Sequence, residues 1–356
     1  MNTTRTLKES VKSNLFIVIT TALFVAASEI LTGIMRYDLY YDEIGPSEFF
    51  GSIIFRILAI PAGFILPYYF GRFLHNKFSV VVAATATIFI VIRSFENRGY
   101  INDFFYNIFF VLALLSLSFY YITSCRNSLA HTICYYIIST ALAAATFDKI
   151  EFFIVLVTIL LIFASNRVLI KRKFVLIVNS VFAIAAIILS ACMFADKMDA
   201  YLGITFIEGS TIHPERVMLA LEQFGKSENF STIAEAPSIY NLTKIFGYYG
   251  NIAGAATCAV IALFVSGFIM KCFKGPSRTK TASLVASIIV SIKCLAGIFE
   301  NFAIISGLYV GIPVLSEGSG GYFIIGILLG FLLAPLRIPK LLDSFIMNIE
   351  YKISGV

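Results

Sequence analysis

Long apolar runs separated by short polar connections occupy nearly the whole chain. A membrane-spanning helix requires about 20 mostly apolar residues, and ten segments approach or reach that length. They are residues 14–35, 49–69, 79–93, 105–124, 130–147, 150–165, 174–195, 245–270, 281–306 and 318–336. Because backbone polar groups inside a bilayer must bond within their own segment, the pattern predicts an all-α, polytopic transmembrane helix bundle. The whole chain, 1–356, is then a single integral membrane domain.

The fifth and sixth segments are short for a full crossing. Residues 130–147 and 150–165 either cross the membrane or form a re-entrant hairpin around Asp148 and Lys149. Both arrangements leave the sidedness of every other segment unchanged.

Composition restricts the class of protein. Of the 356 residues, 59% are hydrophobic and 13% are charged, whereas soluble domains carry about 25% charged residues. Soluble enzyme folds, secreted disulfide scaffolds and nucleic-acid binders are therefore excluded. The six cysteines form no CxxC pair, so we expect them to pack between helices and not to bind metal.

The basic residues predict an orientation. With the N-terminus in the cytoplasm, 17 of the 27 Lys and Arg fall on the inner side and 8 on the outer side. The other two, Arg56 and Lys293, fall well inside predicted spans. Cytoplasmic loops carry the excess of basic residues, so both termini are expected in the cytoplasm. The first apolar run lacks a cleavage pattern and is expected to be a retained helix.

Two outer loops depart from the short connections elsewhere. Residues 196–244 form a periplasmic loop of unusual length, in which 214–224 has the spacing of a short amphipathic helix at the membrane surface. Residues 307–320 are rich in glycine, which suggests irregular backbone that re-enters the bundle. Such backbone is tolerated at membrane depth only where protein or a cavity surrounds it.

Charges inside the spans are the first candidates for function, since each is costly in a bilayer. Arg56 lies in the second segment, Lys293 and Glu300 share one face of the ninth, and Glu29 lies near the outer end of the first. They predict either a polar cavity that opens outward or a set of buried structural pairs.

Arginines on the outer side form a second candidate set. The set consists of Arg36, Arg93, Arg98 and Arg216. Basic residues are normally in excess on the cytoplasmic side, so the orientation of the chain does not explain these outer arginines. A guanidinium group binds phosphate oxygens bidentately. Together with Arg56 these residues are candidates for binding a lipid diphosphate. The alternative is a set of loop ion pairs with Asp38, Asp42, Glu96 and Asp103.

The long loop also offers candidate bases. His213, Glu215 and Glu235 lie in it and are candidates to deprotonate a sugar hydroxyl. The alternative is that they are solvated loop residues. No nucleotide-binding, metalloprotease or dinucleotide motif occurs, and no cofactor is expected.

One stretch resembles the O-antigen and oligosaccharide-repeat polymerases. After the long loop of those enzymes, an Asn/Tyr/Thr-containing turn leads into a long helix with an FG…G entry. The matching residues here are Tyr240, Asn241, Thr243, Phe246, Gly247, Gly250 and Gly254. The segment RYDLYYDEIG, at 36–45, is similar to an outer segment near the N-terminus of many of these polymerases.

A second stretch is similar to the shape, elongation, division and sporulation family of peptidoglycan glycosyltransferases. The similarity lies in NFAIISGLYVGIPVLSEGSGGYF, through Gly307, Gly311, Ile312, Pro313, Ser316, Gly318 and Ser319. The acidic residue that this family has before its eighth span would fall near Ile239, where the nearest acid is Glu235.

Both resemblances imply the same task. A glycosyltransferase in the bacterial inner membrane would join sugar chains carried on a polyprenyl diphosphate, with the bilayer and a chain-length regulator protein as further partners. A secondary transporter, with Lys293 and Glu300 as its midplane charges, is the main alternative from another class. A non-catalytic membrane scaffold is a third.

Overall fold

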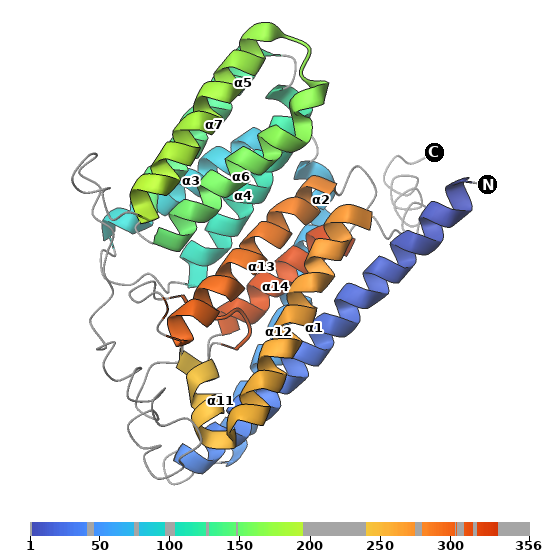
Figure 1. Cartoon of the computed structure of the whole chain (residues 1–356), viewed down its shortest axis with the longest axis vertical. Helices are drawn as coiled ribbons and strands as arrows, with labels where there is room; N and C mark the ends of the chain where they lie inside the picture. Colours follow the sequence, from blue (N-terminus) through green and yellow to red (C-terminus); the bar gives the residue numbers. More distant parts are fainter. Residues whose placement is uncertain are drawn as a thin grey trace, which may run out of the picture.

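The computed structural model describes residues 2–40, 46–74, 78–96, 104–125, 128–146, 149–194, 240–274, 280–302, 304, 310–315 and 319–333. In these ranges the chain is helical almost throughout and contains no strand, which confirms the all-α prediction (Figure 1). The helices are α1 (Asn2–Tyr40), α2 (Pro46–Leu74), α3 (Phe78–Glu96), α4 (Phe104–Ser124), α5 (Leu129–Ala145), α6 (Lys149–Asn166), α7 (Lys173–Phe194), α11 (Asn241–Tyr249), α12 (Asn251–Lys274), α13 (Lys280–Asn301) and α14 (Ser319–Leu333). A short 3₁₀ turn, η2 (Arg167–Leu169), follows α6.

The described helices suit a membrane protein. Six of them are long and apolar enough to cross a bilayer by length and composition. Four shorter apolar helices, Gly51–Ile65, Ser79–Arg93, Leu129–Ala145 and Gly321–Leu333, coincide with the other predicted segments. Large apolar side chains also cover the outside of the bundle: Phe55 of α2 is 68% exposed and Phe174 of α7 is 74% exposed. Ten crossings with both termini inside stays a prediction.

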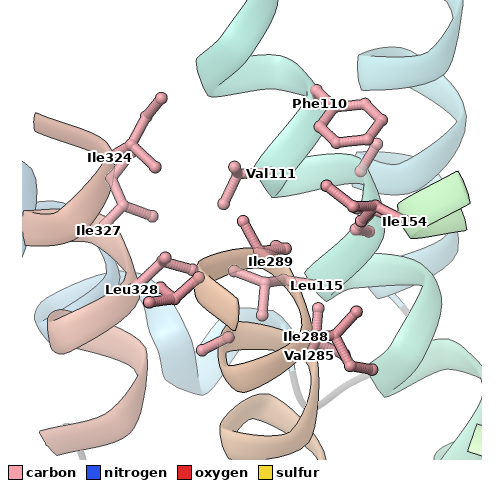
Figure 2. Packing of buried hydrophobic residues seen from close by; sticks show 14 of the residues in the cluster. Phe110, Val111, Leu115, Ile154, Val285, Ile288, Ile289, Ile324, Ile327 and Leu328 are labelled. Carbon is pink, nitrogen blue, oxygen red and sulfur yellow. The ribbon is translucent and has the colours of Figure 1, made fainter. Parts of the chain in front are cut away.

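The helices form two groups that meet along a common core. Figure 1 shows α3 to α7 on one side and α1, α12, α13 and α14 on the other. Figure 2 shows the core between the groups, where side chains of α4, α6, α13 and α14 interdigitate. Phe110 and Leu115 of α4, Ile289 of α13 and Leu328 of α14 are almost fully buried in this core.

Helix directions follow from specific contacts. On α1 and α12, Asn14 pairs with Lys271, and Phe24 packs against Phe264 with ring centroids 4.7 Å apart, so these two helices are antiparallel. In Figure 2, α4 and α14 run in the same direction and α13 runs in the opposite one. These are the relations expected of a chain that reverses direction at each successive apolar helix.

Glycines bring α2 and α14 into close parallel contact. Gly63 of α2 faces the α14 backbone at Phe323. On α14, Gly326 faces the backbone at Ile60, and Gly330, one turn later, faces Phe64 and Pro67 further along α2. Because the position of contact advances along both helices together, the pair is parallel. Small residues at such an interface allow helix backbones to approach closely in a membrane.

The predicted span 245–270 was wrong in one respect. The structure divides it at Gly250, whose φ of +83° ends α11 before α12 begins. A glycine adopts this conformation without steric cost. Moreover, α11 begins at Asn241, inside the segment predicted to be loop. The apolar pattern runs across Gly250 without interruption, so hydropathy alone did not reveal the break.

The close contact of α2 and α14 can be tested with one methyl group. We expect Gly326→Ala to lower the free energy of unfolding by about 1–3 kcal/mol, because overpacking forces backbone shifts and the new Cβ would meet the Ile60 carbonyl. Gly51→Ala is the matched control, since nothing lies near its Cβ position in α2. Unfolding of the purified proteins in detergent micelles measures both. Equal stability of the two variants would contradict the contact.

Candidate functional site

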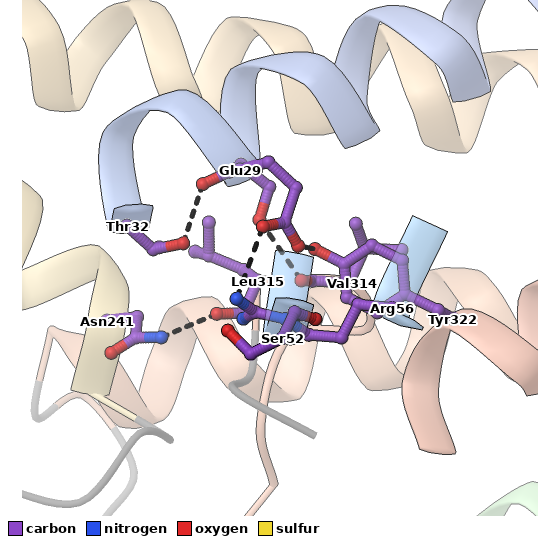
Figure 3. Close-up of polar contacts among 9 residues, drawn as sticks. Glu29, Thr32, Ser52, Arg56, Asn241, Val314, Leu315 and Tyr322 are labelled. Atoms are coloured by element: carbon purple, nitrogen blue, oxygen red, sulfur yellow. Dashed lines mark hydrogen bonds and ion pairs between the residues drawn. The ribbon is translucent and has the colours of Figure 1, made fainter. Parts of the chain in front are cut away.

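Three helices contribute to a cluster of buried polar side chains, Glu29, Arg56 and Tyr322, which we call the charge cluster (Figure 3). Glu29 lies on α1, Arg56 on α2 and Tyr322 on α14. Arg56 Nη2 lies 3.4 Å from Glu29 Oε2, and the two side chains are only 5% and 6% exposed. The Tyr322 hydroxyl donates to Glu29 Oε1. The cluster therefore places a full ion pair inside an apolar bundle.

The arginine of the charge cluster is incompletely coordinated. Its Nε donates to the Ser52 carbonyl at 3.2 Å, but Nη2 makes no hydrogen bond among the described residues. Charge-assisted N–H···O bonds are usually about 2.7–2.9 Å long, so the 3.4 Å contact to Glu29 is loose. A guanidinium group carries five N–H donors. Arg56 therefore retains donors for a further anionic group.

A non-helical segment, residues 310–315, lies beside the charge cluster. The Ser28 hydroxyl of α1 donates to the Val314 carbonyl at 3.0 Å, and Asn241 Nδ2 of α11 donates to the Leu315 carbonyl at 2.6 Å. Val314 has a φ of +73°, a conformation that costs a β-branched residue about 1–2 kcal/mol. Both carbonyl groups are thus held in place by neighbouring helices, despite the strain.

Helix α11 is fixed to α13 as well. The Tyr240 hydroxyl donates to Glu300 Oε1 at 3.2 Å. The Thr243 hydroxyl donates to the Asn301 carbonyl at 2.7 Å, and the Thr243 amide donates to Asn301 Oδ1 at 3.0 Å. The segment at the end of the predicted long loop is therefore anchored both to residues 310–315 and to the end of α13.

A second buried ion pair joins α13 to α6. Lys293 Nζ lies 3.7 Å from Glu151 Oε1 and donates to Asn107 Oδ1 of α4 at 3.3 Å. Lys293 and Glu300, predicted to mark one polar face, thus have separate partners in the structure. Sequence reasoning did not single out Glu151, although a carboxylate at the start of an apolar segment was a usable signal.

The predicted site residues are distributed unevenly over the described structure. It brings Arg56 together with Glu29, and it places the Arg93 guanidinium 5.7 Å from the centre of the Phe89 ring. Arg36 belongs to α1, but its side chain lies outside the described part. The predictions for Arg98, His213, Glu215, Arg216 and Glu235 also fall outside the described residues. The diphosphate-binding and base assignments therefore stay predictions.

Two buried lysines were missed by counting charges alone. Lys271, counted with an inner loop, is buried in α12 and hydrogen-bonds to Asn14. Lys244, counted with the outer loop, is buried in α11. The six cysteines are all buried or partly buried, as expected of residues that pack between helices.

Comparison with known proteins gives no family. No protein-family model and no curated protein matches the chain. The structure aligns with a chain of a solved peptidoglycan synthase complex that coordinates polymerization and crosslinking, with 12% identity and a TM-score of 0.49. The likeness covers 91% of this chain and 98% of that one. A TM-score below 0.5 establishes neither a common fold nor a common activity.

The energetic role of the Glu29–Arg56 pair can be measured by a double-mutant cycle. Breaking a buried ion pair from one side leaves an uncompensated charge, which costs about 3–5 kcal/mol. We therefore expect Arg56→Met alone to destabilise the protein by that amount, and Glu29→Gln plus Arg56→Met together to destabilise it less. Unfolding in detergent measures each variant. Additive losses would contradict a direct interaction between the two side chains.

Proposed function

We propose that the chain is a membrane glycosyltransferase that polymerises oligosaccharide repeat units carried on a polyprenyl diphosphate, as an O-antigen or other surface-polysaccharide polymerase does. The observation that carries this proposal is the charge cluster. A permanently charged guanidinium is buried near the starts of α2 and α14 and keeps unused donors. An ionisable residue at such a place in a membrane protein is a functional candidate by default.

A diphosphate is the anion that best suits this arginine. The guanidinium fork matches phosphate oxygens bidentately and stays charged at every physiological pH. The polyprenyl chain of such a carrier would remain in the bilayer beside the bundle, with its charged head at the depth of Arg56. Arg36, Arg93, Arg98 and Arg216 are proposed to complete the binding of the diphosphate.

The reaction needs no nucleotide, because the bond between sugar and diphosphate supplies the energy. Cationic side chains would stabilise the departing diphosphate, and preorganised electrostatic stabilisation is often the main source of an enzyme's rate enhancement. This requirement agrees with the absence of nucleotide-binding motifs from the sequence. No cofactor enters the proposed reaction.

The long loop is proposed to supply further catalytic groups, His213, Glu215 and Glu235 among them. The anchoring of α11 supports this, because Asn241 bonds to Leu315 beside the charge cluster. Glu235 precedes Asn241 by six residues, and six extended residues span at most about 20 Å. This short connection from Asn241 is consistent with a role for Glu235 in the proposed reaction.

The membrane arrangement completes the proposal. Ten crossings of the bacterial inner membrane, with both termini in the cytoplasm, would place the starts of α2 and α14 and the segment 310–315 toward the periplasm. Lipid-linked glycan is the substrate, and a chain-length regulator is a proposed partner. A peptidoglycan-type polymerase would use the same carrier, so the two proposals differ in the sugar repeat.

Loss of the gene should leave single-repeat glycan in place of long surface-glycan ladders on gels. We expect Arg56→Lys, which keeps the charge but loses the bidentate fork, to reduce polymer formation by about 10²–10³-fold, as removal of a key electrostatic donor does. Arg36→Ala and Arg98→Ala should have the same effect without disturbing the Glu29 pair.

Arg172→Ala is the control, because this exposed arginine precedes α7, a helix that contributes no residue to the charge cluster. Membrane levels of each variant are compared on immunoblots. Unchanged ladders in the deletion strain, or normal ladders in all three site variants, would refute the proposed function.

A further inference from the structure

The ion pair between Glu151 of α6 and Lys293 of α13 includes a carboxylate oxygen that is unbonded within the described part of the chain, which a purely structural ion pair would not need. Glu151 is only 2% exposed, and its Oε2 atom has no hydrogen-bond partner among the described residues. Its other oxygen lies 3.7 Å from Lys293 Nζ, too far for a strong hydrogen bond. The Tyr106 hydroxyl of α4 also lies within hydrogen-bonding range of this carboxylate, but no described residue bonds to Oε2. A buried acceptor without a partner costs about 1–3 kcal/mol or more, so the unmet hydrogen bond requires an explanation.

The Lys293 ammonium group also has hydrogen-bond donors that are not used by the described residues. An ammonium group has three donors and no acceptor, and Lys293 makes one described hydrogen bond, to Asn107 Oδ1 at 3.3 Å. Its side chain is 16% exposed, whereas the Glu151 side chain is 2% exposed. The lysine is thus the more accessible member of the pair, with spare donors beside an unused carboxylate oxygen.

The spare groups define the chemistry of a ligand. One free donor and one free acceptor, side by side, are complementary to a group that both accepts and donates a hydrogen bond. A hydroxyl is such a group: its oxygen would accept from Lys293 and its hydrogen would point to Glu151 Oε2. An anion would be repelled by Glu151 and a cation by Lys293, so a neutral polyol or sugar suits the site best.

The position of this pair agrees with that of the charge cluster. Glu151 and Asn107 lie in the first turn of α6 and α4, whereas Arg56 and Tyr322 lie toward the starts of α2 and α14. In Figure 2, α4 and α14 run in the same direction, and α2 is parallel to α14. Both buried groups therefore lie toward the same end of the bundle.

We propose that Lys293 and Glu151 bind a hydroxyl group of the acceptor glycan, with Glu151 as its general base. The proposal rests on the proposed function and names the second substrate subsite for it. The Glu151 carboxylate takes the hydroxyl proton while the acceptor oxygen forms a bond to the anomeric carbon of the donor. The bond from that carbon to the diphosphate breaks, and the diphosphate leaves with the electron pair. Lys293 holds the acceptor oxygen in position.

Kinetics of the purified protein test the catalytic role. The probe is lipid-linked oligosaccharide extracted from a strain that lacks the gene. We expect Glu151→Gln to lower kcat by about 10²–10⁴-fold, the usual contribution of a general base, with KM changed less than about threefold. Lys293→Met should raise KM, because it removes the donor to the acceptor oxygen.

The exchanged double variant Glu151→Lys plus Lys293→Glu separates catalysis from support of the fold. It restores an ion pair between α6 and α13, so a brace would regain both stability and activity. A hydroxyl subsite would regain stability in detergent but stay inactive. Lys271→Met is the matched control for loss of a buried lysine. Lys271 lies near the C-terminal end of α12 and bonds to the neutral Asn14, so it has no carboxylate partner among the described residues.

A binding measurement keeps this inference separate from the proposed function. Oligosaccharide released from the lipid by mild acid should raise the melting temperature of the wild-type protein and of Lys271→Met, but not that of Lys293→Met. Wild-type protein that binds this glycan and forms no polymer would refute the proposed function alone. Polymer formation with full activity in Glu151→Gln, or in the exchanged variant, would overturn the subsite. Absence of glycan binding by the wild-type protein would overturn it as well.

Discussion

The structure depends on the cost of placing charge in an apolar medium. Arg56 cannot lose its proton, so a carboxylate on another helix must neutralise it, and Glu29 does so with both side chains almost fully buried. This requirement fixes α1 against α2, and Tyr322 adds α14 through the same carboxylate. The close parallel contact of α2 and α14 through Gly63 and Gly326 then sets how near these helices lie.

Polar contacts link the charge cluster to the rest of the described bundle. Ser28, the neighbour of Glu29, holds the strained Val314 carbonyl, and Asn241 holds the next carbonyl from α11. From α11 the contacts continue through Tyr240 to Glu300 on α13. In an apolar interior each such bond is costly to leave unmade. The irregular segment 310–315 is therefore determined by its neighbours and not by its own propensity.

Among the charged side chains of the described residues, those with an unbonded buried atom belong to the two ion pairs that we assign to function. The two buried tyrosines Tyr121 and Tyr136 both donate to Asn179 Oδ1 at 2.7 Å, as in a well-satisfied structural network. Arg56 and Glu151, by contrast, each retain an unbonded buried atom. Folding tolerates such atoms where a ligand completes the coordination, so a diphosphate at one and a hydroxyl at the other would account for both.

The amino-acid sequence by itself determined the class of fold. Bilayer physics requires long apolar helices, and each of the ten predicted segments overlaps a described apolar helix. The amino-acid sequence also indicated Arg56, Lys293 and Glu300 as candidates, because a charge inside an apolar run is visible without a structure. Only the tertiary structure decided the partners of these residues. Arg56 pairs with Glu29, which lies 27 residues before it along the chain. Lys293 pairs with Glu151, 142 residues before it, and Glu300 accepts a hydrogen bond from Tyr240, 60 residues before it. The tertiary structure also decided the break at Gly250 and the burial of Lys271. Hydropathy is averaged over a window of residues, so it contains neither the backbone angle of one glycine nor the helix face that contacts a neighbouring helix.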